Sequence, residues 1–325
     1  SRRAMGMASA LWPHGTLIRE YHGHKKKVHS INWNCLGTKL ASGSVDMSVR
    51  VWAVEELGRT AEMELKGHTG SVDQLRWDPK QSWLLGSASG DKTVRIWDTR
   101  TGKCAQAIET RGENINIRWS PNGQHISVGD KDDNISLIDM RKCMAVHQIK
   151  FPYEANEMAW DPSGELFFIT TGNGTIEVFR FAELLRTAST VSEMSLVAHT
   201  ANCYCIEFDP AGEHFAVGSA DALVSLWALK ELVCVRTFSR LEWPVRTLSF
   251  SHDSVYVACG SEDPVLEIND VASGERAFGI PCNAAMNTVS WHPTRMLLAF
   301  AGDDKDKLGR DEGSLRIFGY QPNLH

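Results

Sequence analysis

The sequence predicts an all-β fold: a seven-bladed propeller in which an N-terminal strand completes the last blade. Two observations carry this prediction. A short block recurs seven times, and a second phrase that ends in an aromatic residue precedes each copy. Internal repeats of about 40–45 residues are typical of propellers, whose blades are four-stranded sheets.

The recurring blocks assign one blade to each copy. The strongest copies are "ASGSVDMSVRVW" (41–52), "SASGDKTVRIW" (87–97) and "VGSADALVSLW" (217–227), and weaker copies begin at residues 128, 169, 258 and 312. A turn Asp or Asn recurs at spacings of 45, 41, 41, 48 and 42 residues. These turn residues are Asp46, Asp91, Asp132, Asn173, Asp221 and Asp263.

The local patterns favour strands rather than helices. Phrases such as "VHSINW" and "VDQLRW" predict the innermost strand of a blade, and runs such as "VRIW" and "VSLW" alternate apolar with polar side chains. Turn residues, among them Pro-x-Gly, separate these runs. The best helix candidate is "FAELLRTAST" (181–190), in the longest segment between blades.

The predicted propeller domain runs from residue 16 to 319, between a flexible N-terminal arm (1–15) and a C-terminal tail (320–325). Its copies lie near 24–52, 68–97, 112–138, 153–179, 199–227, 243–269 and 285–318. After Phe318 only "GYQPNLH" remains, which is too short and polar to complete the last blade. We expect "TLIREYHG" (16–23) to pair into that blade, so that no sheet edge stays open.

Composition excludes some functions and leaves others open. The 325 residues carry a net charge of −6, which argues against a broad phosphate-binding surface. The run Lys25–Lys27 is a candidate basic patch, with a solvated loop as the plainer interpretation. Eight cysteines without a C-x-x-C pair predict reduced thiols and no metal site. No apolar run approaches the roughly 20 residues that a membrane helix needs.

One stretch contains the residue types of a hydrolase triad. His68, Ser87 and Asp91 lie within a single repeat, but similar residues recur in two other repeats, whereas a catalytic site is needed once. In WD repeats a His, a Ser or Thr, the turn Asp and a Trp form a hydrogen-bonded chain, because each would be costly to bury unpaired. We therefore expect structural sets and no catalytic residue. The sets are His24, Ser42 or Ser44, Asp46 and Trp52; His68, Ser87, Asp91 and Trp97; and, in part, His199, Asp221 and Trp227.

Partner contacts are expected on the face where the chain enters each innermost strand. Each innermost strand is expected to end in an aromatic residue. The residues four and six positions before that aromatic should surround the mouth of the central channel. They are Lys27 and His29, Ser71 and Asp73, Glu113 and Ile115, Glu154 and Asn156, Asn202 and Tyr204, Pro244 and Arg246, and Ala285 and Asn287. Trp243 and Arg246 are residue types enriched in interface hot spots, although Trp243 packed between blades is an equal alternative.

Two further motifs stand outside the blade pattern. "WDTR" (97–100) resembles the W-D-x-R sequence of propellers that serve as substrate receptors of cullin–RING ubiquitin ligases, and only Arg100 is informative there because the blade already requires the Trp and Asp. The insert "GDDKDKLGRDEG" (302–313) alternates in charge and lacks the spacing of calcium loops, so a solvated loop is expected.

Several sequence motifs that a propeller blade does not require resemble those of one family. "GENINI", "VGDKDD", "FFITTGNG" and "SRLEWPVRTLSFS" closely resemble the WD-repeat subunit of the THO complex, subunit 3, and the likeness spans about residues 20–318. Departures are Ala228, where an Asp usually follows the Trp, and the atypical "SEDPVLEIND" of the sixth copy.

This resemblance implies a nuclear, non-enzymatic scaffold without a cofactor. Its partners would be the other THO subunits, chiefly the large helical ones, with mRNA export factors contacted indirectly and RNA contact at most minor. The complex would couple transcription and processing of mRNA to export. No membrane association is implied.

Overall fold

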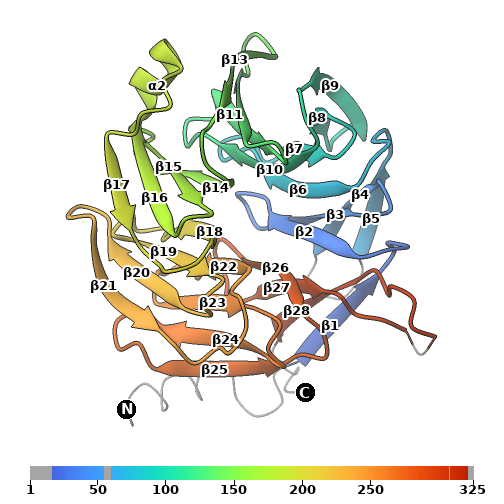
Figure 1. Cartoon of the computed structure of the whole chain (residues 1–325). Helices are drawn as coiled ribbons and strands as arrows, with labels where there is room; N and C mark the ends of the chain where they lie inside the picture. Colours follow the sequence, from blue (N-terminus) through green and yellow to red (C-terminus); the bar gives the residue numbers. More distant parts are fainter. Residues whose placement is uncertain (1–16, 55–59, 307, 321–325) are drawn as a thin grey trace.

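Seven four-stranded antiparallel sheets form a closed ring in the computed structural model, which describes residues 17–54, 60–306 and 308–320 (Figure 1). Each sheet is one blade, and the prediction of a seven-bladed propeller is confirmed. Blades 1 to 6 use four consecutive strands each, whereas blade 7 combines three C-terminal strands with the first strand of the chain. The expected arm, residues 1–15, lies outside the described residues.

The two inner strands of each blade carry the recurring phrases. The innermost strands of blades 1 to 7 are β2 (Val28–Trp33), β6 (Val72–Trp77), β10 (Asn114–Trp119), β14 (Ala155–Trp160), β18 (Cys203–Phe208), β22 (Thr247–Phe250) and β26 (Met286–Trp291). The second strands are β3 (Lys39–Ser44), β7 (Leu84–Ser89), β11 (His125–Asp130), β15 (Leu166–Thr171), β19 (His214–Ser219), β23 (Tyr256–Gly260) and β27 (Leu298–Gly302).

The two outer strands complete each sheet. The third strands are β4 (Val49–Val54), β8 (Thr93–Asp98), β12 (Asn134–Asp139), β16 (Thr175–Arg180), β20 (Val224–Ala228), β24 (Val265–Asp270) and β28 (Ser314–Tyr320). The outermost strands are β5 (Thr60–Leu65), β9 (Lys103–Glu109), β13 (Met144–Lys150), β17 (Met194–Val197), β21 (Val233–Phe238), β25 (Arg276–Pro281) and β1 (Leu17–His22).

The N-terminal strand closes the ring as predicted. Strand β1 pairs antiparallel with β28, from Leu17 opposite Tyr320 to His22 opposite Ser314. The strand is slightly shorter than the expected 16–23, and β28 extends to Tyr320, one residue into the expected tail. Because β1 occupies the outer edge of blade 7, the two ends of the described chain lie in one sheet.

Ion pairs reinforce this closure. Arg316 on β28 donates from Nε to Oε1 of Glu20 on β1 at 2.9 Å, and its Nη1 donates to Oδ2 of Asp304 at 2.9 Å. The Asp304 side chain is buried, so this guanidinium neutralises a carboxylate that water barely reaches. One arginine thus links the first strand of the chain to the last.

The hydrophobic core lies between blades rather than within one layer. Seven buried clusters each combine residues of two neighbouring sheets. The cluster between blades 7 and 1 includes Ile31, Trp33 and Ile317, so it forms only when the ring is closed. Stacked sheets that bury their faces on each other are the usual solution for propeller blades.

Inner-strand tryptophans join adjacent blades through hydrogen bonds. The indole Nε1 of Trp33 donates to the carbonyl of Ser290 at 3.2 Å, and that of Trp77 donates to the carbonyl of Asn32 at 2.9 Å. Each acceptor belongs to the innermost strand of the preceding blade. The Trp that ends the inner-strand phrase thus links blade 1 to blade 7 and blade 2 to blade 1.

Among the described residues, the helix is α2 (Phe181–Thr187), which follows β16 directly. Phe181 and Leu184 are buried against the core between blades 3 and 4. The helix is shorter than the expected 181–190 because Ala188 adopts a left-handed conformation, φ 51°, and its N–H bonds to the carbonyl of Leu184. Within the described part of the chain, no helix is both long and apolar enough to span a membrane.

We predict that Arg316→Ala lowers the free energy of unfolding by about 1–3 kcal/mol, because buried Asp304 would lose its charged partner. Urea denaturation measures the change. The matched control is Arg186→Ala, whose partner Glu183 is exposed, and such a surface pair is worth less than about 1 kcal/mol. Equal stability of the two variants would contradict the role given to the closing ion pairs.

Candidate functional site

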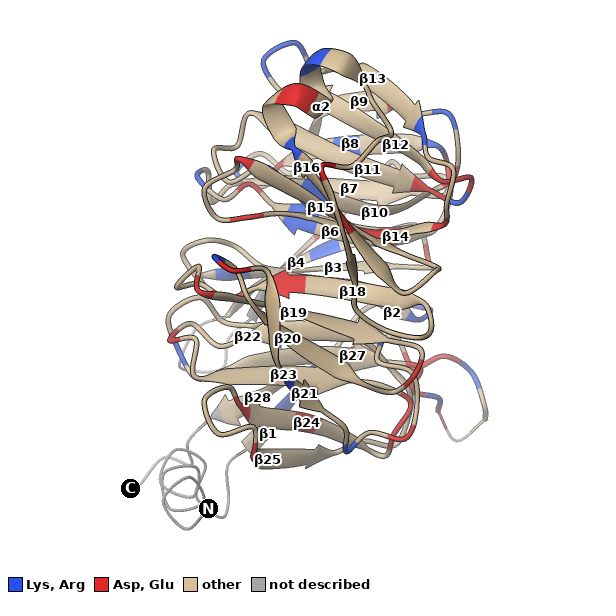
Figure 2. Cartoon of the chain, turned by 60° about the vertical axis from the view of Figure 1, so that its left-hand side comes forward, with Lys and Arg blue, Asp and Glu red and all other residues tan. Residues whose placement is uncertain are grey.

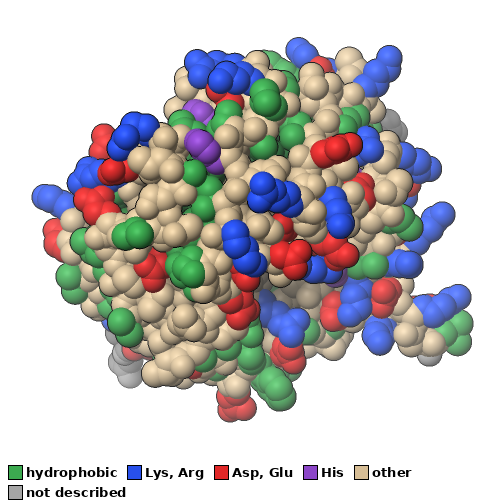
Figure 3. Space-filling view, turned by 45° about the horizontal axis from the view of Figure 1, so that its top comes forward, with side chains coloured by type: hydrophobic (Ala, Val, Ile, Leu, Met, Phe, Trp, Pro, Cys, Tyr) green, Lys and Arg blue, Asp and Glu red, His purple; other side chains and the backbone are tan. Residues whose placement is uncertain are grey.

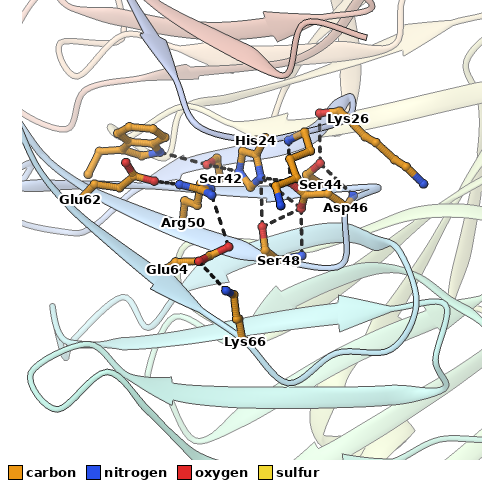
Figure 4. Close-up of polar contacts among 12 residues, drawn as sticks. His24, Lys26, Ser42, Ser44, Asp46, Ser48, Arg50, Glu62, Glu64 and Lys66 are labelled. Carbon is orange, nitrogen blue, oxygen red and sulfur yellow. Dashed lines mark hydrogen bonds and ion pairs between the residues drawn. The ribbon is translucent and has the colours of Figure 1, made fainter. Parts of the chain in front are cut away.

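The first His, Ser, Asp and Trp set forms one continuous hydrogen-bonded chain in blade 1 (Figure 4). Trp52 Nε1 donates to Ser42 Oγ at 3.0 Å, Ser42 Oγ lies 2.8 Å from His24 Nε2, and His24 Nδ1 lies 3.0 Å from Asp46 Oδ2. Since a carboxylate only accepts, Nδ1 carries the imidazole proton and Nε2 accepts from the serine. Ser44, the other candidate hydroxyl, donates instead to the carbonyl of Lys26 at 3.1 Å.

Blade 2 repeats the arrangement with the residues that resembled a triad. His68 Nδ1 lies 2.8 Å from Asp91 Oδ2, and its Nε2 lies 2.7 Å from Ser87 Oγ. Ser87 Oγ also accepts from Trp97 Nε1 at 2.8 Å, and the His68 side chain is only 1% exposed. Ser87 is buried between an imidazole and an indole, so it is not exposed to a substrate. The geometry is that of a structural hydrogen-bond network within the blade.

Blade 5 completes its set with a serine that the sequence reasoning missed. His199 Nδ1 lies 3.0 Å from Asp221 Oδ2, while Nε2 lies 2.8 Å from Oγ of Ser225. Trp227 Nε1 donates to the same Ser225 Oγ at 2.8 Å. The hydroxyl therefore comes from the third strand of the blade rather than the second.

The strand register explains this exchange. Ser42 on β3 lies opposite Arg50 on β4, but in blade 5 the corresponding pair is Val217 opposite Ser225. The third strand of the blade therefore supplies the hydroxyl in place of the second strand, and this hydroxyl still bonds to the histidine Nε2 atom. The available signal was "VSLW", where Ser replaces the Arg that stands two residues before the Trp in "VRVW" and "VRIW".

Blades 3 and 6 lack this histidine, and other hydrogen bonds stabilise their turns. In blade 6, Asp263 accepts the backbone N–H groups of Glu242 and Trp243, both at 3.2 Å. In blade 3, Asp130 accepts the Asn134 N–H and side-chain amide, each at 2.9 Å. Asp132 lies in the turn between β11 and β12, as predicted, but its side chain is exposed and Asp130 makes the bonds that stabilise this turn.

Burial and hydrogen bonding determine how these groups ionise. Burial opposes ionisation of Asp91, but hydrogen bonds from Thr93, the Thr69 N–H and His68 outweigh it and lower the pKa of the carboxyl to about 2. Burial also opposes ionisation of Asp46, but hydrogen bonds from His24, Ser48 and the Lys25 N–H outweigh it and hold the pKa of this carboxyl well below its usual range. Burial lowers the pKa of His68, and Asp91 only partly offsets the effect. The set therefore holds a neutral imidazole beside a carboxylate.

The predicted partner-binding residues lie on one face of the disc, which we call the top face. Adjacent strands run in opposite directions, so the loops that enter the innermost strands share this face with the turns between second and third strands. Several of these residues already have partners. Lys27 Nζ lies 2.7 Å from Asp303 Oδ2, His29 Nδ1 lies 3.2 Å from Asp73 Oδ1, and Glu113 lies 2.5 Å from Lys131 Nζ.

Two further polar side chains of the top face, and one backbone carbonyl, are also bound to neighbours. Asn287 Nδ2 donates to Asp303 Oδ1 at 2.8 Å, and Arg246 pairs with Glu262. The Asn156 carbonyl accepts from Asn116 Nδ2 at 2.6 Å. These bonds fix the shape of the face and reduce its free charge.

Two aromatic side chains stand out on the top face. Trp243 is 52% exposed and Tyr204 is 37% exposed, so the alternative in which Trp243 packs between blades is wrong. The sulfur of Cys205, which follows Tyr204 in the chain, lies 3.7 Å from the carbonyl of Val245, two residues after Trp243. The top face therefore carries exposed aromatic surface beside fixed polar groups.

The central channel contains charged groups that bind one another. Arg118 Nη1 donates to Glu207 Oε2 at 3.0 Å, and Gln74 Nε2 donates to Glu157 Oε2 at 2.7 Å. Burial, together with nearby Arg118, lowers the pKa of Arg76 to about 10. The cavity between these side chains measures about 70 Å³. This network joins the inner strands of blades 2 to 5.

The other candidate motifs have local explanations. Arg100 donates from Nη2 to Asp98 Oδ2 at 2.6 Å, and its guanidinium lies 4.8 Å from the ring centre of Trp83. Lys25 and Lys26 are exposed. In the described part of the chain, no group of three or more His, Cys, Asp or Glu side chains could hold a metal ion.

Together, the closed ring and the buried imidazole, hydroxyl and carboxylate sets define a WD-repeat β-propeller. The solved β-propeller domain of Cps50 (Swd1) from Myceliophteria thermophila has this fold, with a TM-score of 0.81 over 94% of this chain and 100% of that one at 18% identity. That likeness shows the fold alone.

Two sequence comparisons identify the family within this class. The model of the THOC3 beta-propeller domain matches residues 24–301. THO complex subunit 3 of Arabidopsis thaliana is 55% identical over 306 residues, which cover 93% of this chain and 95% of that protein. The WD repeat-containing protein AAC3 of Dictyostelium discoideum is 38% identical over 93% of this chain and 66% of its own length. The chain belongs to the THO complex subunit 3 family.

We predict that His68→Ala lowers the free energy of unfolding by about 1–3 kcal/mol, because Ser87 and Asp91 would be left buried with too few partners. Chemical denaturation gives the value. His22→Ala is the control, because the His22 side chain is 58% exposed. A variant that lost a hydrolase activity while keeping wild-type stability would argue for a catalytic His68 instead.

The blade-2 set also predicts a fall in stability on acidification. His68 has a lowered folded pKa, so its contribution is complete above the unfolded value of about 6.5 and is lost as the pH falls below it. Asp91 also has a lowered folded pKa, so its contribution is present above about 3.9 and is lost as the pH falls toward about 2. Melting curves recorded against pH should show both losses.

Asp91→Asn isolates the carboxylate part of this pH dependence. The variant should melt at a lower temperature near neutral pH, and its stability should fall less than that of the wild type below about pH 4. Asp132→Asn, which alters an exposed carboxylate outside the set, serves as the control. Parallel curves for Asp91→Asn and the wild type across the acidic range would refute the assignment.

Proposed function

We propose that the chain is a non-enzymatic scaffold subunit of a THO complex and works by binding other proteins. The observation that carries this proposal is membership of the THO complex subunit 3 family across almost the whole chain. The positions of the side chains agree with this proposal. The histidine, serine and aspartate residues that could suggest chemistry are buried in bonds that fasten blades 1, 2 and 5.

The proposal places the chain in the nucleus, where the complex couples transcription and processing of mRNA to export. Its direct partners are the other THO subunits, chiefly the large helical ones, and it contacts export factors indirectly. A net charge of −6 and the pairing of Lys27 with Asp303 favour protein contacts over extensive RNA contacts.

The exposed aromatic surface of the top face is the proposed docking surface. Trp243 is the central anchor, because a half-exposed indole gains most when a partner buries it. Tyr204 extends the apolar area, and the pairing of Arg246 with Glu262 fixes a polar rim beside it. A rigid surface of this kind loses little conformational entropy on binding.

Trp243→Ala is expected to weaken binding to the purified remaining THO subunits at least about tenfold, which corresponds to about 1.4 kcal/mol. Biolayer interferometry with the whole chain measures the affinity. Met144→Ala is the matched control, because Met144 is 55% exposed on the outer strand of blade 3, away from the top face.

Membership of a THO complex and the docking surface can be refuted independently of each other. A wild-type chain that binds none of the THO subunits refutes membership of the complex. A Trp243→Ala chain that binds as tightly as the wild type leaves membership intact and refutes the docking surface.

A further inference from the structure

A groove lies between blades 5 and 6 on the bottom face, which we define as the face opposite the top face. The loop between β18 and β19 (209–213) and the loop between β22 and β23 (251–255) both contribute to its lining. Figure 2 shows the sheets of these two blades stacked one on the other. The groove has a volume of about 480 Å³, which lies within the range of about 300–1,000 Å³ that is typical of ligand sites.

Part of the groove lining is apolar. Leu226 and Val271 are buried and belong to the core cluster between the two blades. Val235 and Val255 also line the groove, and they are 51% and 40% exposed. A ligand with an apolar group that covers these two valines removes them from water, which favours binding.

Two carboxylates of the groove have no cationic partner in the described part of the chain. Glu213 and Asp253 are both exposed, and neither forms an ion pair with a described Lys, Arg or His side chain. Asp253 Oδ1 accepts from Ser251 Oγ at 2.6 Å and from the Val255 N–H at 3.2 Å, so this carboxylate is held in place. The Glu213 N–H donates to Asp209 Oδ1 at 2.8 Å, which fixes the backbone that carries the Glu213 side chain.

The basic side chains that line the groove are already bound within the chain. Arg236 on β21 donates from Nη2 to the carbonyl of Ala272 at 2.8 Å and from Nη1 to the carbonyl of Ser273 at 3.1 Å. Both acceptors lie in the loop after β24, so this arginine fixes the outer strand of blade 5 to blade 6. His214 Nδ1 lies 3.8 Å from Oδ2 of buried Asp209. The two exposed carboxylates of the groove are left without a charged partner.

Many other exposed charges of the chain are paired. Figure 3 shows acidic and basic side chains intermingled on the face that it displays. Lys131 pairs with Glu113 and Arg180 pairs with Glu193, for example, and such pairs neutralise each other. The groove between blades 5 and 6 instead keeps excess negative charge beside exposed valines. A ligand that complements it is cationic and partly apolar.

We propose that the groove binds a Lys or Arg side chain of another protein subunit. These side chains combine an apolar stem with a cationic head, so they match both parts of the lining. The stem packs on Val235 and Val255, and the head binds the carboxylates of Glu213 and Asp253. The inference rests on the proposed function, because the partner is taken to be a subunit of the same complex.

The charge of the groove favours a protein ligand over RNA. Single-stranded RNA is bound by cations that contact phosphates and by aromatic side chains that stack on bases. The groove offers carboxylates, which repel phosphates, and aliphatic side chains such as Val235. It also lies on the face opposite Trp243, so it is a contact separate from the docking surface proposed above.

The test measures binding of the whole chain to the purified remaining THO subunits. Glu213→Lys replaces an attracting charge with a repelling one, so the affinity should fall at least about fivefold, and adding Asp253→Lys should lower it further. Higher salt should weaken wild-type binding, because the proposed contact is ionic. The matched control is Glu165→Lys, since exposed Glu165 occupies in "DPSGEL" of blade 4 the position of Glu213 in "DPAGEH" and lies outside the groove.

Val235→Asn tests the apolar part of the contact. This variant should weaken binding by a smaller factor, because the stem of the bound side chain loses one apolar neighbour. The matched control is Val233→Asn, because Val233 is 55% exposed on the same strand and does not line the groove. If Glu213→Lys lowers the melting temperature, Glu213→Gln takes its place, since it removes the charge without adding another and should also weaken binding.

Each outcome decides the inference. Weaker binding by Glu213→Lys and Val235→Asn, with wild-type binding by both controls and unchanged melting temperatures, supports it. Wild-type affinity of Glu213→Lys overturns it and leaves the proposed function intact. Weaker binding by Val235→Asn alone indicates an uncharged apolar ligand and also overturns it. Failure of the wild type to bind any subunit refutes the proposed function itself.

Discussion

Each blade of this propeller buries its apolar faces only against its two neighbours, so the first and last blades are fully packed only when the ring closes. The cluster between blades 7 and 1 contains Trp33 and Ile317, which come from opposite ends of the chain. Strand β1 completes blade 7, and Arg316 bridges Glu20 and Asp304 across this junction. Closure is thus the constraint on which the packing of blades 1 and 7 depends.

Closure also determines what the polar side chains do. In a thin stack of sheets the turns lie close to buried surface, and each buried polar group there needs a partner. His24, His68 and His199 meet this need by joining a carboxylate to a serine hydroxyl. Groups that resemble a catalytic triad therefore stabilise the disc.

The top face carries two kinds of side chain. Trp243 and Tyr204 are exposed aromatic residues of blades 6 and 5. Other top-face side chains, such as Lys27 and Asn287, are bound to Asp303. The bonded side chains fix the shape of the face, whereas the two aromatic side chains remain accessible to solvent.

The sequence by itself determined the number of blades, the N-terminal closing strand and the sets of His24 and His68, because these features recur with a fixed period and each copy supports the others. It did not reveal Ser225, because the hydroxyl that reaches His199 comes from a neighbouring strand and only the register brings it there. It left the position of Trp243 open, since exposure depends on how loops from two blades meet.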